Sequence, residues 1–201
     1  MDTVICMGGS VTAAMGLEKA LGPEMAKKTV AVIGDSTFFH SGITGLIDMV
    51  YNNAQGTVVI LDNRITAMTG HQQNPGSGKT LQLQASPVLS LEDICKACGV
   101  KDVTIVDPLD LKATEAAIKA AVNHPGVSVV IAKSPCILIE KSFKPALHVD
   151  EDLCIGCKLC LKLGCPAISF DGKKKKSRID PIFCTGCEVC ASLCPKKAMK
   201  R

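Results

Sequence analysis

Short continuous apolar runs alternate with longer helical stretches over the first 132 residues of the chain. Continuous runs rich in Val, Ile and Ala are typical of parallel strands that are buried on both faces. The predicted strands are Thr29–Ile33, Thr57–Leu61, Val103–Val106 and Val127–Ala132. The predicted helices are Val11–Leu21, Ser41–Asn53, Leu91–Cys98 and Leu111–Val122. Because strand and helix alternate, the pattern predicts an α/β fold, a doubly wound parallel sheet with helices on both faces.

Two segments interrupt this alternation. After Asp62-Asn63, nearly 30 residues rich in Gly, Gln, Thr and Pro show no period, and loops of this length in compact domains are usually functional. Ser134–Val149, which contains Pro135 and Pro145, is expected to be a linker. The sequence therefore predicts an α/β domain over residues 1–140 and a small α+β domain over residues 141–201.

Composition narrows the class of protein. Hydrophobic residues make up 47% of the 201 residues and aromatic residues only 3%, which favours an aliphatic α/β core. The longest apolar runs fall short of the roughly 18 residues that a membrane-spanning helix needs. Abundant cysteines without a recognisable targeting segment predict a reducing, cytoplasmic location.

Much of the net charge of +4 lies in the basic run Lys173–Lys176 and Arg178. This run is either the solvated tip of a hairpin or a docking patch for an acidic electron carrier. Aromatic residues do not interleave with it, which argues against a nucleic-acid partner.

Eight of the 12 cysteines lie near the C-terminus, in two similar runs that are offset by 30 positions. The first run is Cys154, Cys157, Cys160 and Cys165, followed by Pro166. The second run is Cys184, Cys187, Cys190 and Cys194, followed by Pro195. A C-x2-C-x2-C-x3-C-P run holds a 4Fe–4S cluster, so the doubled run predicts two clusters.

In such pairs the fourth cysteine of each run serves the other cluster. The predicted ligands are Cys154, Cys157, Cys160 and Cys194 for cluster 1, and Cys184, Cys187, Cys190 and Cys165 for cluster 2. Gly156 and Gly186 are expected to let the loop backbone approach the inorganic sulfurs. Four residues instead of three separate Cys160 from Cys165, so an insertion around Leu163-Gly164 either bulges the loop or changes the cluster geometry on that side.

Zinc and disulfide bonds are the alternative explanations of the cysteine runs. Zinc sites usually use four ligands in two pairs, which two runs of four with trailing prolines fit poorly. Disulfide frameworks belong to small secreted chains. Outside the runs, Cys95 and Cys98 lie in a predicted helix and are expected to be buried free thiols.

Polar residues follow two of the predicted strands. Gly34-Asp35-Ser36 comes directly after the first strand, and Asp62-Asn63 follows the second, with 28 positions between Asp35 and Asn63. Ligands of open parallel sheets bind at the carboxyl ends of the strands, so these side chains are expected to lie close together. Their oxygens suit Mg²⁺, and Gly34 and Ser36 would present donors to a diphosphate. A lone Gly-Asp-Ser is more often only a turn.

The segments at these two strand ends carry a more specific pattern. Gly-Asp followed 28 positions later by Asn is similar to the thiamine-diphosphate motif. Residues 61–72 read Leu-Asp-Asn-Arg-Ile-Thr-Ala-Met-Thr-Gly-His-Gln, and Asp-Asn followed by Met-Thr-Gly-x-Gln looks like the 2-oxoacid:ferredoxin oxidoreductases. With Gly34–Gly42 and the doubled cysteine run, the whole chain resembles the C-terminal part of the α subunits of indolepyruvate ferredoxin oxidoreductases.

The resemblance implies a role for each of these residues. The Mg²⁺ ligands that it implies are Asp35, Asn63 and the backbone carbonyl of Ile65. The residues that it places around the thiamine diphosphate are Gly34, Ser36 and Thr66, with Gly70 beside the thiazolium. The catalytic candidates in the wall where the 2-oxoacid sits are Thr69, His71 and Gln72.

The resemblance also implies an activity and partners. The activity is oxidative decarboxylation of an aryl 2-oxoacid to an acyl-coenzyme A, with electrons passed through two 4Fe–4S clusters. The implied partners are the 2-oxoacid, coenzyme A, an external ferredoxin, a β subunit and an N-terminal half in the same or a separate chain; nucleic acid and membranes are not among them.

Two other functions stay open from the sequence. The chain is alternatively an electron-transfer subunit or inactive fragment without thiamine chemistry of its own. A thiamine decarboxylase without redox output is the third reading, and the eight cluster cysteines argue against it.

Overall fold

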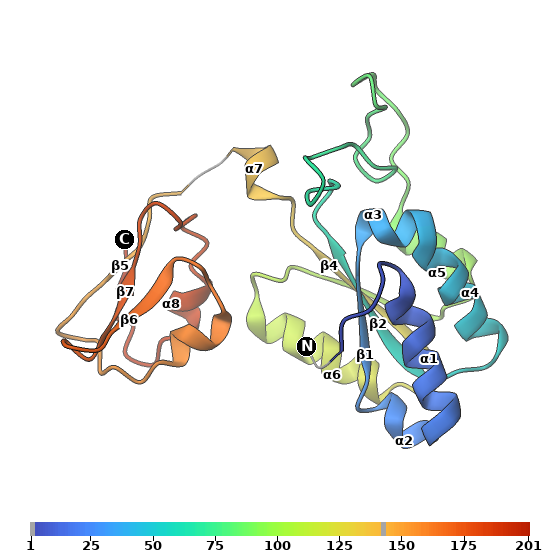
Figure 1. The fold of residues 1–201 in the computed structure, drawn as a ribbon, viewed down its shortest axis with the longest axis horizontal. Helices are drawn as coiled ribbons and strands as arrows, with labels where there is room; N and C mark the ends of the chain where they lie inside the picture. The colour runs from blue at the N-terminus through green and yellow to red at the C-terminus, as the bar shows by residue number, and fades with distance from the viewer. Residues whose placement is uncertain (1–2, 142–143) are drawn as a thin grey trace. The chain divides into compact units, whose positions relative to one another are not determined.

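Four parallel strands form one sheet in the first part of the chain (Figure 1). In chain order they are β1 (Val30–Gly34), β2 (Gly56–Asp62), β3 (Asp102–Val106) and β4 (Val127–Lys133). Their order across the sheet is β1-β2-β4-β3. Gly34 at the end of β1 lies opposite Leu61 of β2, so Asp35 and Asp62 leave the sheet at the same edge.

The computed structural model describes residues 3–141 and 144–201, and the chain divides into the units Met1–Cys136 and Ile137–Arg201. The predicted linker Ser134–Val149 is wrong in its extent. It contains the one-turn helix α7 (Ile137–Glu140) and the strand β5 (His148–Val149), and residues 142–143 lie outside the described residues. Pro135 precedes α7 and Pro145 precedes β5. Proline is tolerated just before a helix and just before a strand, so these two prolines are compatible with both elements.

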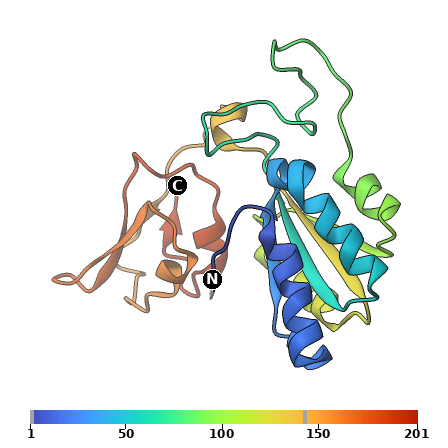
Figure 2. The same cartoon turned by 45° about the vertical axis from the view of Figure 1, so that its right-hand side comes forward.

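Helices cover both faces of the sheet, which confirms the predicted doubly wound arrangement (Figure 2). The helices on the first face are α1 (Gly9–Leu21), α4 (Ile43–Tyr51) and α5 (Leu91–Ala97). Val11, Leu46 and Cys95 from these helices are fully buried against the sheet. On the opposite face α6 (Leu111–Asn123) packs its Ala121 on Val59 and Val130. The short helix α2 (Pro23–Ala26) follows α1.

Helical structure begins at Asp35, earlier than the predicted start at Ser41. The chain turns from β1 directly into α3 (Asp35–Thr37), then into a π-helical turn (Phe38–Gly42), and then into α4. Phe38 is fully buried, and a Cβ added to Gly42 would lie 2.7 Å from Ile33. Close packing of this turn on the end of β1 therefore determines where the helix begins. The hydrophobic periodicity of the sequence did not indicate this contact. Such π turns are frequent at functional sites.

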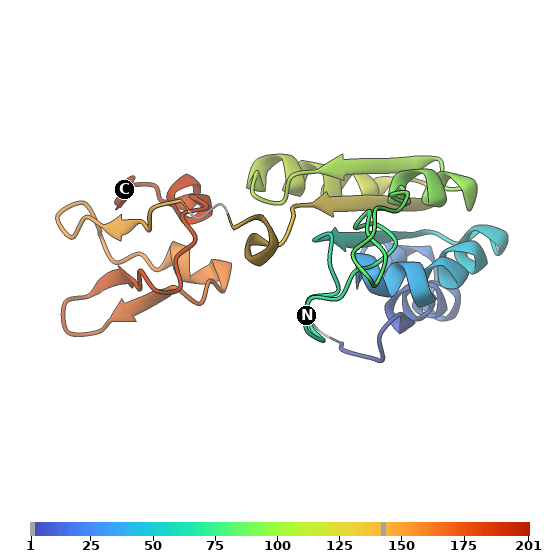
Figure 3. The same ribbon diagram turned by 90° about the horizontal axis from the view of Figure 1, so that it is seen from above.

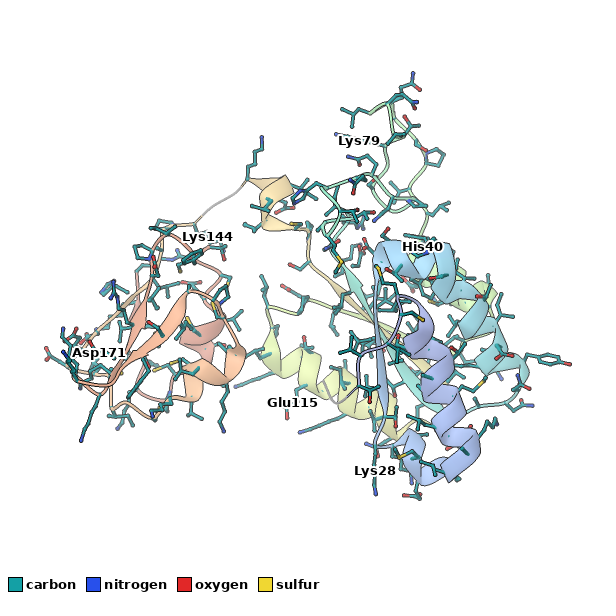
Figure 4. The ribbon with its side chains drawn as sticks, viewed as in Figure 1. Lys28, His40, Lys79, Glu115, Lys144 and Asp171 are labelled. Carbon is teal, nitrogen blue, oxygen red and sulfur yellow. The ribbon has the colours of Figure 1, made fainter. Side chains whose placement is uncertain are left out.

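The predicted functional loop stands at the edge of the sheet where α3 begins (Figure 1). Between Asp62 and Leu91 the structure has turns and two isolated bridges, Thr66 with Gln72 and Lys79 with Ala85. Figure 4 labels Lys79 in the part of this loop that extends farthest from the sheet. The loop therefore brings residues distant in sequence to the carboxyl ends of the strands.

The second unit is a small α+β arrangement built around the cysteine runs (Figure 3). Its strands form the hairpin of β6 (Ile168–Asp171) with β7 (Lys176–Ile179), and the pair of β5 with β8 (Met199–Lys200). Besides α7, its helices among the described residues are a 3₁₀ helix (Leu159–Leu163) and α8 (Val189–Leu193). Across residues 3–141 and 144–201, no helix is long and apolar enough to cross a membrane.

Candidate functional site

Asp35 is a buried carboxylate at the carboxyl end of β1, and only 3% of its surface is exposed. One carboxylate oxygen accepts a hydrogen bond from the Ser36 N–H at 2.7 Å, and the other accepts one from the Asn74 amide at 3.1 Å. Burial raises the pKa of the Asp35 carboxyl, against these hydrogen bonds that lower it, and the nearby Asp62 carboxylate raises it further. A cation bound here would offset the cost of keeping Asp35 ionised.

The neighbouring acid, Asp62, already has a positive partner. The guanidinium Nε of Arg64 lies 3.3 Å from one Asp62 carboxylate oxygen, and the Arg64 N–H donates to the other at 3.2 Å. The Arg64 side chain also donates to the carbonyl of Gly76 at 3.3 Å. The charge of Asp62 is therefore compensated within the protein, which leaves Asp35 as the carboxylate suited to a metal ion.

Asn63 lies in a turn that hydrogen bonds to its side chain and to its backbone hold in place. Its side-chain oxygen accepts a hydrogen bond from the Ile65 N–H at 3.1 Å, and Ile65 is 4% exposed. Its backbone carbonyl accepts from the Cys136 N–H at 3.0 Å, and the Asp62 carbonyl accepts from the Ser134 N–H at 3.0 Å. The segment after β4 thus holds the turn that carries the predicted Mg²⁺ ligands Asn63 and Ile65.

Asn74 is a site residue that the sequence analysis did not identify. It lies in the long loop and is 7% exposed. Its amide nitrogen donates to Asp35, and its amide oxygen accepts from the Gly76 N–H at 2.9 Å. Asn74-Pro75-Gly76 is a turn signal in the sequence, but only the folded loop shows that the turn lies against Asp35.

The residues predicted to hold a diphosphate also lie together. The Thr66 hydroxyl donates to the Ser36 hydroxyl at 2.7 Å, which joins the start of α3 to the loop after β2. A Cβ added to Gly8 would lie 2.3 Å from the Ser41 hydroxyl oxygen, so the segment before α1 packs on the helical turns that follow Gly34. Backbone N–H groups at the start of this helical segment and two hydroxyls are donors that suit phosphate oxygens.

Thr69, Gly70, His71 and Gln72 form an exposed turn after Thr66. Thr66 and Gln72 exchange two backbone hydrogen bonds, of 3.0 and 3.2 Å, and the Thr69 hydroxyl donates to the Gln72 side-chain oxygen at 2.6 Å. Gly70 and His71 both adopt positive φ, 112° and 65°. The turn therefore presents the three catalytic candidates to solvent beside Thr66. His40, labelled in Figure 4, is also exposed.

These residues fit Mg²⁺ and a diphosphate. A carboxylate without a cationic partner, an amide oxygen and a backbone carbonyl are the hard oxygen ligands that Mg²⁺ takes, with phosphate oxygens and water completing its octahedron. Asp35, Asn63 and Ile65 supply those three groups from two neighbouring strand ends. The roles of the individual residues stay predictions.

The structure brings together the four cysteines predicted for cluster 1. Cys154, Cys157, Cys160 and Cys194 line one small cavity of the second unit, with Ser177 and Met199 also in its wall. Cys154 and Cys160 are buried, at 7% and 6% exposure. Three of these cysteines come from residues 154–160 and the fourth, Cys194, directly follows α8, as the crossed arrangement of ligands requires.

The four cysteines predicted for cluster 2 also lie together. Burial, and to a smaller extent the neighbouring sulfurs of Cys187, Cys165 and Cys184, raise the pKa of the Cys190 thiol to about 11. Iron would remove this cost, because metal binding deprotonates a coordinating thiol outright. Over the described residues, no three His, Cys, Asp or Glu side chains are spaced for a single metal ion.

Gly156 and Gly186 occupy matching places in the two loops. Both adopt positive φ, 67° and 70°. A Cβ on Gly156 would lie 2.3 Å from the carbonyl oxygen of Lys175, and one on Gly186 would lie 2.6 Å from that of Pro145. Both loops therefore need glycine to approach a neighbouring backbone segment.

The extra residue between Cys160 and Cys165 sits at the end of a short helix. The 3₁₀ helix Leu159–Leu163 ends at Gly164, whose φ is 64°. Gly164 turns the chain so that Cys165 lies beside Cys190. All 12 cysteines lie in the described part of the chain, and they are free thiols there. Cys95 is fully buried and Cys98 is partly buried, and burial raises the pKa of Cys95 to about 12.

Family comparisons agree with this geometry. The family "Thiamine pyrophosphate enzyme, C-terminal TPP binding domain" matches residues 1–132, and the family "4Fe-4S dicluster domain" matches residues 146–195. The chain therefore belongs to the thiamine pyrophosphate enzymes, with their C-terminal TPP-binding domain joined to a 4Fe–4S dicluster domain.

Its relatives are more specific. Along 100% of its length the chain is a homologue of the indolepyruvate oxidoreductase subunit IorA of Pyrococcus abyssi, with 43% identity over 219 residues. The chain spans 34% of that relative's length. Its cluster region is 45% identical over 60 residues to the pyruvate synthase subunit PorD of Methanothermobacter marburgensis, which covers 30% of this chain and 67% of PorD.

A solved structure supports the fold of the first unit. The 2-oxoglutarate:ferredoxin oxidoreductase from Magnetococcus marinus superposes with a TM-score of 0.55 at 23% identity. The match covers 64% of this chain and 45% of that chain. At this identity the similarity shows the α/β fold.

Proposed function

We propose that the chain is part of an enzyme that oxidatively decarboxylates aryl 2-oxoacids of the indolepyruvate type. The products are an acyl-coenzyme A and electrons, which leave through two 4Fe–4S clusters to a ferredoxin. The main observation in support is that one chain combines the strand-end residues around Asp35 with two separate sets of four cysteines. The homology with IorA supports the choice of substrate class.

In this proposal the first unit holds the cofactor. Thiamine diphosphate supplies a carbanion equivalent and an electron sink for loss of CO₂. Asp35, Asn63 and the Ile65 carbonyl hold Mg²⁺, and Asn74 keeps the Asp35 carboxylate in place. Gly34, Ser36 and Thr66 hold the diphosphate at the start of the helical segment.

The exposed turn of Thr69, Gly70, His71 and Gln72 faces the 2-oxoacid in this proposal. The paired backbone hydrogen bonds between Thr66 and Gln72 fix the turn relative to the diphosphate donors. Thr69, His71 and Gln72 then offer a hydroxyl, an imidazole and an amide to the substrate. Exposure of the turn leaves room for the substrate and for coenzyme A to enter.

The second unit receives the electrons. Each cluster carries one electron, while decarboxylation with acyl transfer releases two, so two clusters match the chemistry. The proposed partners are coenzyme A, an external ferredoxin, a β subunit, and an N-terminal half in the same or a separate chain; the chain spans 34% of the length of its Pyrococcus abyssi relative.

Anaerobic reconstitution of the full chain tests the proposal. The chain should take up about eight iron atoms and as much acid-labile sulfide. Calorimetry should show binding of thiamine diphosphate that depends on Mg²⁺. Asp35→Asn should abolish this binding, while the exposed Asp93→Asn should not change it.

The alternative function gives a different result. A chain that takes up iron but no thiamine diphosphate, even with excess Mg²⁺ and cofactor, is an electron-transfer subunit. Turnover of indolepyruvate is then tested by adding the N-terminal portion and β subunit of a relative to the reconstituted chain. Failure to release CO₂ in the complete assembly contradicts the proposed activity.

A further inference from the structure

The two cysteine loops have the same shape but different neighbours. Gly156 of the first loop packs on the carbonyl of Lys175, and Gly186 of the second packs on the carbonyl of Pro145. The two glycines are 30 positions apart, and so are Lys175 and Pro145. The second unit is therefore an internal repeat, and the residues around one cluster site can be compared with those around the other, position by position.

The repeat places Lys176 and Ser177 beside the first loop where the second loop has Ala146 and Leu147. A positive charge and a hydroxyl thus stand where the other site has a methyl group and an isobutyl group. Ser177 is 5% exposed and lies in the wall of the cavity formed by the cluster 1 cysteines. The two cluster sites therefore differ at these two positions, of which Ser177 lines the cavity.

Ser177 contacts a cluster ligand directly. Its hydroxyl oxygen lies 3.2 Å from the sulfur of Cys160, and both groups are buried. A cysteine bound to iron is a thiolate and has no proton to give, so Ser177 must be the donor. The N–H of Ala198 also donates to a ligand of this set, the sulfur of Cys194, at 3.3 Å.

Lys176 brings a cation to the same site. Its ammonium group donates to the carbonyl oxygen of Cys154 and has no carboxylate partner among the described residues. Of the three carboxylates just before Cys154, Asp150 pairs with Lys200 at 2.6 Å and Glu151 pairs with Lys174 at 2.8 Å. Asp152 forms no ion pair among the described residues, but it is exposed, so solvent and salt screen its charge.

Cluster 2 has a poorer set of donors. In the described segments, its ligands receive one hydrogen bond at sulfur, from the Leu147 N–H to Cys184 at 3.4 Å. The acidic residues of its loop are Asp180, which caps the Ile182 N–H, and Glu188, which pairs with Arg201 at 3.1 Å. In the described part of this site, no side-chain hydroxyl donates to a ligand sulfur, and Ala146 stands at the position equivalent to Lys176. Lys144 lies beside Gly186 of this loop and forms no ion pair among the described residues, but no hydrogen bond joins its ammonium group to the loop there.

We infer that Lys176 and Ser177 make the Cys154 cluster the higher-potential cluster of the pair. Reduction adds one negative charge to a cluster, and hydrogen bonds to sulfur and nearby cations stabilise the more negative state. One electron then moves downhill from the Cys184 cluster, which is oxidised, to the Cys154 cluster, which is reduced. The inference rests on the proposed function, because it requires both clusters to assemble.

Potentiometric titration of the anaerobically reconstituted full chain, followed by electron paramagnetic resonance, tests the inference. Two reduction waves are expected in the unmodified chain. Ser177→Ala and Lys176→Gln should each lower only the higher-potential wave. The equilibrium constant for that one-electron step should fall about tenfold, a shift of about 59 mV. Lys176→Arg keeps the charge and should restore the original potential.

Matched control variants distinguish an effect on the reduction potential of a cluster from an effect on folding of the second unit. Ser169→Ala and Lys175→Gln change exposed residues of the same hairpin and should leave both waves in place. Ala146→Lys places a lysine at the equivalent position of the other site and should raise the lower-potential wave. Iron and sulfide content is measured for each variant.

The outcomes are distinguishable. Chains that assemble no clusters overturn the proposed function and this inference with it. Chains that assemble both clusters but whose higher wave does not move in the Ser177 and Lys176 variants overturn this inference alone. A shift of the lower-potential wave in these two variants also overturns it.

Discussion

At the scale of single residues, the first unit stores an unfavourable charge where it would bind a metal. Asp35 is buried, its pKa is raised above the usual range, and the nearby Asp62 is already paired with Arg64. A carboxyl whose pKa is higher in the folded chain than in the unfolded chain binds protons more tightly when folded. Its contribution to stability is therefore fully present below the unfolded pKa and is lost as the pH rises through the folded pKa.

The first prediction follows from this sign. Without Mg²⁺ and cofactor, Asp35→Asn should raise the melting temperature of the first unit at pH 7, by a few degrees for about 1 kcal/mol. The gain should disappear well below pH 4, where Asp35 is protonated in either state. Mg²⁺ with thiamine diphosphate should stabilise the unmodified chain and leave the variant unchanged. Thermal unfolding between pH 3 and 8 measures both effects; a variant less stable at pH 7 contradicts the argument.

How far the sequence predicts this site depends on how each residue reaches it. Asp35 and Asn63 follow predicted parallel strands, and the rule that the carboxyl ends of parallel strands meet at one edge was enough to place both residues at the same edge of the sheet. Asn74 lies in a loop whose sequence has no hydrophobic periodicity, so its contact with Asp35 depends on how the whole loop folds. The same holds for Cys136, whose N–H reaches Asn63 from beyond β4.

The second prediction concerns Asn74. Asn74→Ala removes the amide that orients the Asp35 carboxylate, and loss of such a supporting hydrogen bond typically weakens metal binding roughly 10- to 100-fold. Titration of the chain with Mg²⁺ at fixed thiamine diphosphate measures the change. Asn123→Ala, at the exposed end of α6, is the control and should bind Mg²⁺ normally. Equal Mg²⁺ affinity for the Asn74 variant and the unmodified chain would show that Asn74 only shapes the loop.

At the scale of elements, the cysteine loops are fixed by backbone approach. The sequence predicted that Gly156 and Gly186 let the loop backbone approach the inorganic sulfurs, and this stays a prediction. The structure adds that both glycines pack against a neighbouring carbonyl. The hairpin of β6 and β7 supplies one of these carbonyls, at Lys175. Sequence spacing identified the ligands but did not show which strand supports each loop, because that contact is tertiary.

The third prediction tests these supports. Gly156→Ala forces a Cβ to within 2.3 Å of a backbone oxygen at a residue of positive φ, so the first loop must distort. The reconstituted chain should lose about half of its iron, or about four of eight atoms. Gly186→Ala should lose the other half. Gly172→Ala in the hairpin turn, where the added Cβ meets nothing within 4 Å, should retain all of it; full iron content in the Gly156 variant contradicts the prediction.

At the scale of the whole molecule, the two units differ in the residues that fill their cores. The core of the first unit is aliphatic and includes Val11, Leu46 and Val129. The core of the second unit includes Cys160 and Cys190, so the cluster ligands are themselves its buried residues. Metal binding by such a core is also folding free energy.

The fourth prediction is that removal of iron unfolds one unit only. Treatment of the reconstituted chain with a chelator and oxidant should make amides of residues 144–201 exchange with solvent, while β1, β2 and β4 keep their protection. Hydrogen exchange with mass spectrometry measures both regions in one experiment. Exchange that spreads equally through the sheet would mean that the two units do not fold independently.

The four lysines of the basic hairpin turn differ in their contacts, which the sequence did not show. Lys176 donates to the Cys154 carbonyl and Lys174 pairs with Glu151, whereas Lys173 and Lys175 are exposed and have neither kind of contact. Figure 4 labels Asp171, the residue of β6 that leads into this turn. Of the four lysines in the run, two are thus engaged within the chain. An acidic electron carrier would be attracted mainly by the other two.

The fifth prediction concerns the two lysines of the run without such contacts, Lys173 and Lys175. In the complete enzyme, the double change Lys173→Glu and Lys175→Glu should raise the Michaelis constant for ferredoxin about tenfold at low salt, because it reverses the local field that steers the carrier. The difference should shrink near 1 M salt, where the Debye length is only about 3 Å. Lys101→Glu with Lys112→Glu reverses two exposed charges on the first unit and should have little effect. Since all four changes alter net charge equally, a similar rise in both double variants would indicate a non-specific charge effect, and an unchanged constant in the hairpin variant would exclude the turn as the docking patch.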